Sequence, residues 1–168
     1  PSKLNATRRD LEGRHYLTGD ELNLQLFMPQ IENIGGAYAG VGADQAYLFI
    51  GWQRPEIAWL TDYDPWIKWL HRCYHVFFET SQTPDEFVSW WDKKNKKKAT
   101  SLLEQAFAGT EDGQKSLDVF RVAQRKTFTR LKRMRRLYRR QKVASYLTDQ
   151  QTYDFVRAMV MAKRVRPL

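Results

Sequence analysis

Short apolar runs separated by polar positions over residues 35–64 predict the start of a parallel α/β fold. Residues 36–41 are small and mostly apolar, which favours a buried strand. Residues 44–53 have apolar positions at helical spacing, and Pro55 ends that pattern. Residues 57–60 form a second apolar run. Strand, helix and strand in this order are typical of a Rossmann-like βαβ unit, so we predict an α/β fold class.

The pattern after the second run predicts mainly helices. Apolar residues recur every three or four positions from 65 to 80. Thr83 and Asp149 each precede a further helical pattern and are predicted N-caps. One long helix is expected over about residues 116–142, with an apolar stripe on one side and arginines elsewhere. The remainder of the domain is therefore expected to be largely helical.

Two polar stretches give further local expectations. Thr18 and Glu21 have capping-box spacing, which predicts a helix over about residues 22–31. The run 93–98 contains five lysines and no acid, and is expected to be the most mobile segment.

The chain is expected to contain one domain, residues 17–168, after a surface segment over residues 1–16. Residues 165–168 are expected to approach a strand that this chain does not contain. Two strands do not make a stable sheet alone, so an open edge beside the βαβ unit is expected, covered by helices or another chain. We expect the first half of a doubly wound sheet, which needs a missing C-terminal half or a second chain.

Composition is that of a folded protein. The 168 residues are 42% hydrophobic and include six Trp, eight Tyr and nine Phe. The sequence contains no apolar run of membrane-spanning length and no visible leader, so a cytoplasmic location is expected. One Cys and three His argue against a zinc site.

The net charge of +9 is unevenly distributed. Residues 121–142 contain eleven Lys or Arg and no acid. The rest of the chain, outside this stretch and the lysine run, contains twelve basic residues and all nineteen acidic residues. The sequence therefore predicts an acidic to neutral domain with a basic helix.

The glycine-rich turn is the strongest chemical motif. Gly40 and Gly42 allow close approach of a ligand to the backbone, and Asp62 follows Gly42 by twenty residues, the usual distance of a ribose-binding acid. Gln45 replaces the third glycine of a dinucleotide motif, which favours S-adenosylmethionine over NAD. The alternative is that the glycines only turn the chain and Asp62 caps the next helix. The predicted cofactor-binding residues are Gly40, Gly42, Asp44, Gln45, Asp62 and Asp64.

Residues 35–64 resemble the N-terminal half of an uncharacterised bacterial Rossmann-type family that is similar to S-adenosylmethionine-dependent methyltransferases. The matching segments are Gly-Gly-Ala-Tyr-Ala-Gly-Val-Gly-Ala-Asp-Gln and Arg-Pro-Glu-Ile-Ala-Trp-Leu-Thr-Asp. The resemblance covers about residues 16–168 and implies a nucleoside-type cofactor. It identifies no catalytic residue or methyl acceptor. Ala43 and Ala46 depart from the family pattern, and Tyr63-Asp64-Pro65 replaces a basic segment.

His71 and His75 lie one helical turn apart. Such a pair can bind a metal ion, and either His can act as a general base. Their aromatic surroundings favour hydrogen-bonded packing residues instead. No third ligand is close in sequence, so no metal site is predicted.

The basic helix has several interpretations. It suits a phosphate backbone, with Arg130, Arg133, Arg136 and Arg140 as predicted contacts. It also suits a solvated helix that shields its apolar stripe, or one that docks on an acidic protein surface. An anionic membrane fits less well, because the stripe is needed for packing. The rival function is therefore a non-catalytic module that binds nucleic acid or a partner.

Overall fold

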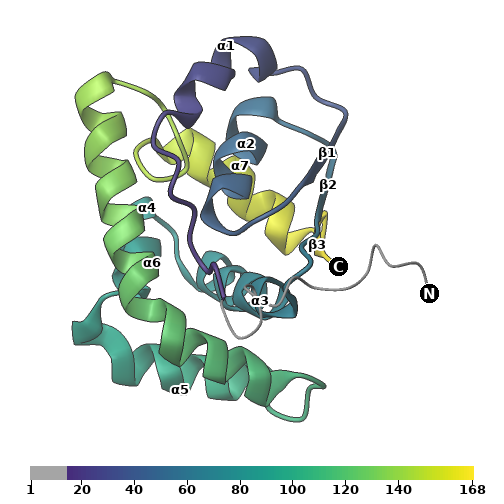
Figure 1. Cartoon of the computed structure of the whole chain (residues 1–168), viewed down its shortest axis with the longest axis vertical. Coiled ribbons are helices and arrows are strands. Elements are labelled where there is room, and N and C mark those ends of the chain that lie inside the picture. Colours follow the sequence, from purple (N-terminus) through teal and green to yellow (C-terminus); the bar gives the residue numbers. More distant parts are fainter. Residues whose placement is uncertain (1–14) are drawn as a thin grey trace.

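The computed structural model describes residues 15–168, which contain one open sheet of three parallel strands (Figure 1). Strands β1 (Ala37–Gly40), β2 (Ile57–Leu60) and β3 (Val165–Pro167) lie in this order across the sheet. Ala37 pairs with Ile57, and Ala58 with Val165. The predicted α/β class and the parallel βαβ unit are confirmed, but β1 is exposed or half-buried along its length, so the expectation of a buried first strand is wrong.

Helices make up most of the remaining chain. The α-helices are α1 (Met28–Ile31), α2 (Asp44–Gln53), α3 (Pro65–Thr80), α4 (Pro84–Trp90), α5 (Lys96–Phe107), α6 (Gly113–Gln141) and α7 (Gln150–Met161). Two short 3-10 helices, η3 (Leu24–Phe27) and η4 (Lys93–Asn95), precede α1 and α5. No helix in this part of the chain is long and apolar enough to cross a membrane.

One face of the sheet is buried and the other is not. Successive strand residues point to opposite faces. Ala58, Leu60 and Val165 are buried, whereas Ala39 and Arg166, which both pair with Trp59, are exposed. Helices α2, α3 and α7 lie together beside the sheet (Figure 1). The described helices therefore cover one side of the sheet.

The core is an aromatic cluster between the helices. Tyr47 of α2 stacks on Tyr74 of α3 with ring centroids 5.0 Å apart. Phe78 of α3 stacks on Phe87 of α4 at 4.2 Å, and Trp91 packs edge-on against Phe77. Each fully buried side chain of this size contributes about 1.5–3 kcal/mol, so the strongly apolar α3 anchors the surrounding helices.

Three helix starts follow the capping chemistry of the sequence. Thr83 accepts a hydrogen bond from the Glu86 amide, and Asp149 accepts one from the Thr152 amide. Asp64 accepts one from the Trp66 amide and begins α3. The predicted caps at Thr83 and Asp149 are confirmed, and Asp64 rather than Asp62 caps the helix after β2.

The predicted capping box near the N-terminus is wrong. The first helical residues are Leu24–Phe27, preceded by Asn23, and neither Thr18 nor Glu21 caps them. The Gly19 amide instead donates to Asp44 at the start of α2, 3.1 Å away. A tertiary contact therefore determines the path of this segment. Residues 1–14 lie outside the described part of the chain, and so does most of the predicted surface segment.

Two further expectations are corrected. The lysine run 93–98 forms η4 and the first turn of α5, where the Asp92 side chain accepts from the Lys94 amide. Val165–Pro167 is itself a strand and pairs with β2. The edge beside β2 is therefore covered by the same chain, and the strand on the open side of the βαβ unit is β1, which pairs with no other described strand.

Candidate functional site

A cavity of about 550 Å³ lies beyond the carboxyl ends of β1 and β2. Parallel α/β folds bind their ligands at this edge of the sheet. Its lining comes from residues 16–21, the glycine turn over residues 41–45, the loop after β2 over residues 62–64, and Ile67 of α3. Among the predicted cofactor-binding residues, Gly42, Gln45, Asp62 and Asp64 line this cavity, whereas Gly40 and Asp44 do not.

Asp62 joins the glycine turn to the loop after β2. One carboxylate oxygen accepts from the Gly42 amide at 3.0 Å, and the other accepts from the Asp64 amide at 3.0 Å. This direct contact leaves no space for a ribose between the turn and Asp62. A ligand reaches Asp62 only from the cavity side, where each oxygen retains capacity to accept a further hydrogen bond.

His71 holds the same turn from the interior. Its Nε2–H donates to the Gly42 carbonyl at 3.0 Å, and this tautomer leaves Nδ1 to accept from the Tyr47 hydroxyl at 2.9 Å. Burial lowers the pKa of His71 to about 4 and that of His75 to about 3. His71 is therefore a neutral residue that positions the turn. No cluster of metal-ligating side chains occurs in residues 15–168.

Gly42 has a structural role that requires no ligand. Its φ is +81°, a conformation that favours glycine, and a Cβ there would collide with the side-chain amide of Gln45. Gln45 packs between Gly42 and Gly19, and its Oε1 is buried without a hydrogen-bond partner among the described residues. Because this oxygen is closed to solvent, a ligand in the cavity can bond to it only if the Gln45 side chain changes rotamer.

Asp44 is a structural residue. Its side chain is 1% exposed, and its carboxylate accepts from Arg130 Nε of α6 at 2.8 Å and from the Gly19 amide. Because both oxygens have partners inside the fold, Asp44 fixes α2, α6 and residue 19 relative to one another.

The cavity lining is acidic. Among residues 15–168, its lining includes the carboxylates of Asp20, Glu21, Asp62 and Asp64 and no Lys or Arg. Such a lining attracts hydrogen-bond donors and cations and repels phosphates.

His15 is a neighbour of the site that the sequence did not reveal. Its Nδ1 bonds to Asp64 Oδ2 at 2.9 Å, and its ring stacks on Trp66 at 3.8 Å. Asp64 thus ties the segment before the cavity to the start of α3. A lone His in a polar N-terminal stretch gives no sequence pattern from which this contact could be predicted.

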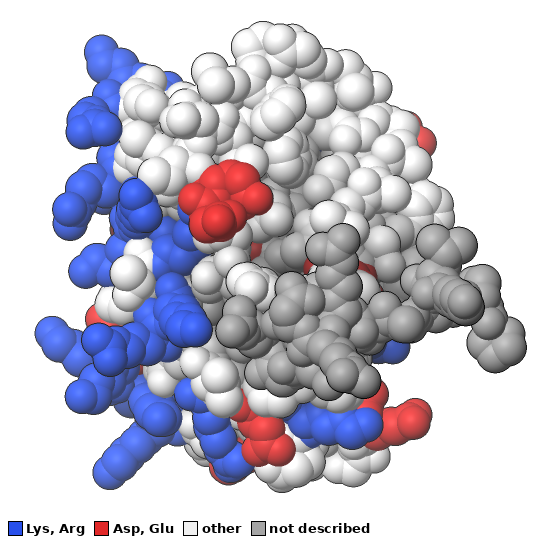
Figure 2. Space-filling view, in the orientation of Figure 1, with Lys and Arg blue, Asp and Glu red and all other residues white. Residues whose placement is uncertain are grey.

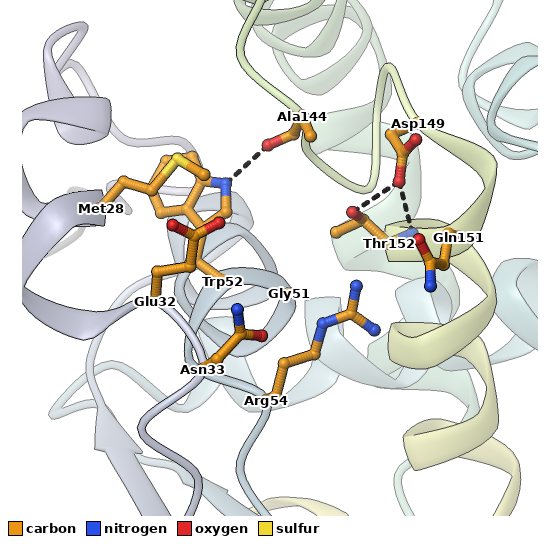
Figure 3. Close-up of a pocket in the computed structure, with 10 residues that line it drawn as sticks. All are labelled: Met28, Glu32, Asn33, Gly51, Trp52, Arg54, Ala144, Asp149, Gln151 and Thr152. Atoms are coloured by element: carbon orange, nitrogen blue, oxygen red, sulfur yellow. Dashed lines mark hydrogen bonds between the residues drawn. The ribbon is translucent and has the colours of Figure 1, made fainter.

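A second cavity of about 480 Å³ lies between α1, α2 and α7 (Figure 3). The indole N–H of Trp52 donates to the Ala144 carbonyl at 2.7 Å, and Asp149 accepts from the Thr152 amide and hydroxyl, both at 2.7 Å. The Arg54 guanidinium also packs on the Phe155 ring at 4.6 Å. The Trp52 bond joins α2 to the segment before α7, and the Asp149 bonds cap α7, so we assign these groups a structural role.

A comparison with protein-family models matches residues 16–168 to the family described as "Domain of unknown function (DUF7790)". The chain belongs to this family. A search of curated proteins finds no match. The DUF7790 match covers the same residues as the resemblance in the sequence, but it links the chain to no methyltransferase. All the residues lining the acidic cavity lie inside the DUF7790 match, and His15 lies just before it.

Proposed function

We propose that this DUF7790 chain binds a phosphate-free nucleoside ligand of the S-adenosylmethionine type in the acidic cavity. The four carboxylates in its lining, with no Lys or Arg among the described lining residues, support this most directly. Ribose hydroxyls and amino groups donate hydrogen bonds that carboxylates accept, and a sulfonium carries a positive charge. A triphosphate is anionic and instead requires positively charged side chains or N–H donors around it.

The residues present fit such a ligand in part. Asp62 accepts hydrogen bonds at the cavity, and Asp20 and Glu21 add exposed carboxylates there. Gly42 is held in place by Asp62 and His71. S-adenosylmethionine supplies an electrophilic methyl group when bound. The residues of this chain bind and orient the ligand, and the methyl acceptor stays open.

Isothermal titration calorimetry with S-adenosylmethionine, S-adenosylhomocysteine and ATP tests the proposal. The first two are expected to bind, and ATP at least about tenfold more weakly, because its phosphates meet four carboxylates. Asp62→Asn is expected to weaken binding about tenfold, since it removes an acceptor and its charge. Asp118→Asn, an exposed change on α6, is the matched control and leaves affinity unchanged.

The melting temperature of each variant separates loss of binding from loss of the fold, because Asp62 also bonds two backbone amides. Absence of heat with both S-adenosyl compounds would refute the nucleoside proposal. Equal affinity for ATP would refute the assigned preference for phosphate-free ligands.

A further inference from the structure

Helix α6 has a surface of unneutralised positive charge. From residue 121 onward, eight cations of α6 and Lys142 after it are exposed: Arg121, Arg125, Lys126, Lys132, Arg133, Arg136, Arg139, Arg140 and Lys142. Within the described chain, only Arg121 forms an ion pair, with Asp118. Figure 2 shows Lys and Arg gathered along the side of the molecule that α6 forms. Little internal structure depends on these side chains.

Two other arginines of α6 serve the fold. Arg130 is 6% exposed and pairs with buried Asp44, and Arg135 pairs with Asp85 of α4. Arg130 therefore differs from the expectation for an exposed contact residue, whereas Arg133, Arg136 and Arg140 are exposed. The long helix thus separates structural cations from free ones.

Five of the exposed cations line a groove between α6 and the segment over residues 18–22. A cavity of about 460 Å³ lies between Thr18–Asp20 and residues 125–133 of α6, and one of about 210 Å³ lies between Leu22 and residues 133–140 of α6. Arg133 lines both cavities, so they are neighbours along the helix. We call this the α6 groove; its exposed cations are Arg125, Lys126, Arg133, Arg136 and Arg140.

The buried Arg130 lies at the first cavity of the groove. Its Nη2 is buried and has no partner among the described residues, while its Nε is bonded to Asp44. Because Nη2 is closed to solvent, an anion in this cavity reaches it only after the guanidinium rotates, and the bond is then charge-assisted. This feature distinguishes the groove from a uniformly solvated helix.

We propose that the α6 groove binds the phosphate backbone of a nucleic acid. Its exposed cations extend over about 22 Å of helix, a length that spans several phosphates at about 3.4 Å per residue of one duplex strand. Four of the five are arginines, whose planar guanidinium binds phosphate through two hydrogen bonds. Contacts of this kind position the backbone without reading base sequence.

Two other anionic partners fit less well. Membrane-surface helices place large apolar side chains beside their cations, but Val122 is the one exposed large hydrophobic residue of α6. An acidic protein surface would need its own carboxylates placed along about 22 Å of helix, whereas one strand of a duplex supplies a negative charge about every 3.4 Å. Both are outcomes of the test below.

The groove adjoins the acidic cavity. Thr18, Gly19 and Asp20 line both, so this short segment separates the two. A nucleic acid in the groove would lie beside the proposed nucleoside cavity. Binding in the groove does not depend on a ligand in that cavity, and the two are measured separately.

Fluorescence anisotropy with a short labelled DNA duplex and its RNA counterpart tests the groove. With five phosphate contacts, the logarithm of the association constant is expected to fall with log salt at a slope of about −4.5 for duplex DNA. Affinity then drops roughly 500-fold between about 50 and about 200 mM salt. Absence of binding at the lower salt, or binding that salt does not weaken, would overturn the proposal.

Two triple variants locate the contact. Arg133→Gln, Arg136→Gln and Arg140→Gln remove three groove cations, while Arg121→Gln, Lys132→Gln and Arg139→Gln remove three exposed cations outside both cavities. The groove variant is expected to reduce the steepness of the salt slope by about 3 and to weaken binding more than about tenfold. The control is expected to change affinity less than about threefold.

Equal losses in the two variants would show a general charge effect and overturn the groove. Polyglutamate or anionic phospholipid vesicles that bind as tightly as DNA would instead identify an acidic protein or a membrane as the partner. Circular dichroism of both variants confirms that each is folded before comparison.

Discussion

At the residue scale, a few polar side chains connect segments that are far apart in sequence. Asp44 bonds to Arg130, 86 residues later, and to the Gly19 amide. The Asp62 carboxylate accepts a hydrogen bond from the Gly42 N–H, and the His71 ring donates one to the Gly42 carbonyl. The two side chains therefore fix the backbone on both sides of Gly42. Removing one partner of a buried ion pair leaves an uncompensated charge, so such contacts are costly to break.

Asp44→Ala is expected to lower the free energy of unfolding by about 3–5 kcal/mol, because Arg130 would remain buried and unpaired. Urea denaturation measures the change. Asp118→Ala is the control: it breaks the exposed pair with Arg121 and is expected to cost less than about 1 kcal/mol. Similar losses in the two variants would contradict a structural role for the buried pair.

At the element scale, helices with local start chemistry form where the sequence predicts them. α3, α4 and α7 each begin beside a side chain that accepts a backbone hydrogen bond, and α6 follows its predicted apolar stripe. The short elements were not predictable in the same way. β3 has three residues and forms only because β2 pairs with it.

The N-cap of α7 gives a test at this scale. Asp149→Ala is expected to destabilise the protein by about 1 kcal/mol, because the Thr152 amide loses its acceptor. Asp149→Asn, which still accepts, is expected to retain most of the stability. Asp154→Ala, an exposed change in the same helix, is expected to stay within about 0.5 kcal/mol in thermal melts. A loss in the Asn variant as large as in the Ala variant would argue against capping.

At the scale of the whole molecule, charge is separated across one short segment. The acidic cavity and the α6 groove share residues 18–20, so opposite charges lie on the two sides of that segment. The open sheet leaves one face largely uncovered by the described helices. Completion as a doubly wound sheet stays a prediction.

Global stability is expected to fall as the pH drops from about 6.5 towards 5. Burial lowers the pKa of His71 to about 4, from the 6.5 that applies in the unfolded chain, so the unfolded state binds the proton first in this window. The stability that comes from keeping His71 neutral is fully present at a pH above the pKa of His71 in the unfolded chain. It is lost as the pH falls towards the pKa of His71 in the folded protein. For His71 this amounts to roughly 2 kcal/mol by about pH 5, and His75, with a pKa lowered to about 3, adds to it.

Urea denaturation at about pH 7 and about pH 5 measures this effect. His71→Gln, whose amide can donate to Gly42 and accept from Tyr47, is expected to lose about half as much stability as the unmodified protein over this interval. An imidazole NMR signal of His71 that titrates near 6.5 in the folded protein would contradict the assignment.

Part of the site was predictable from the sequence. The spacing of Gly42 and Asp62 correctly placed both at one cavity, together with Gln45 and Asp64. The same pattern did not show that Asp62 bonds directly to the Gly42 amide, or that Asp44 faces Arg130. Sequence spacing predicts which edge of a sheet a residue reaches, but the partner of its side chain depends on elements that arrive from elsewhere.

The sequence by itself determined the parallel βαβ unit, the amphipathic helices and the caps at Thr83 and Asp149. These features depend on periodicity and on hydrogen bonds between residues a few positions apart. Only the tertiary structure decided that residues 165–167 add a third strand, that residues 15–23 run without a helix, and that Arg130 is buried against Asp44 while other cations of the groove are exposed. Each of these depends on contacts between distant segments, for which a single sequence has no local pattern.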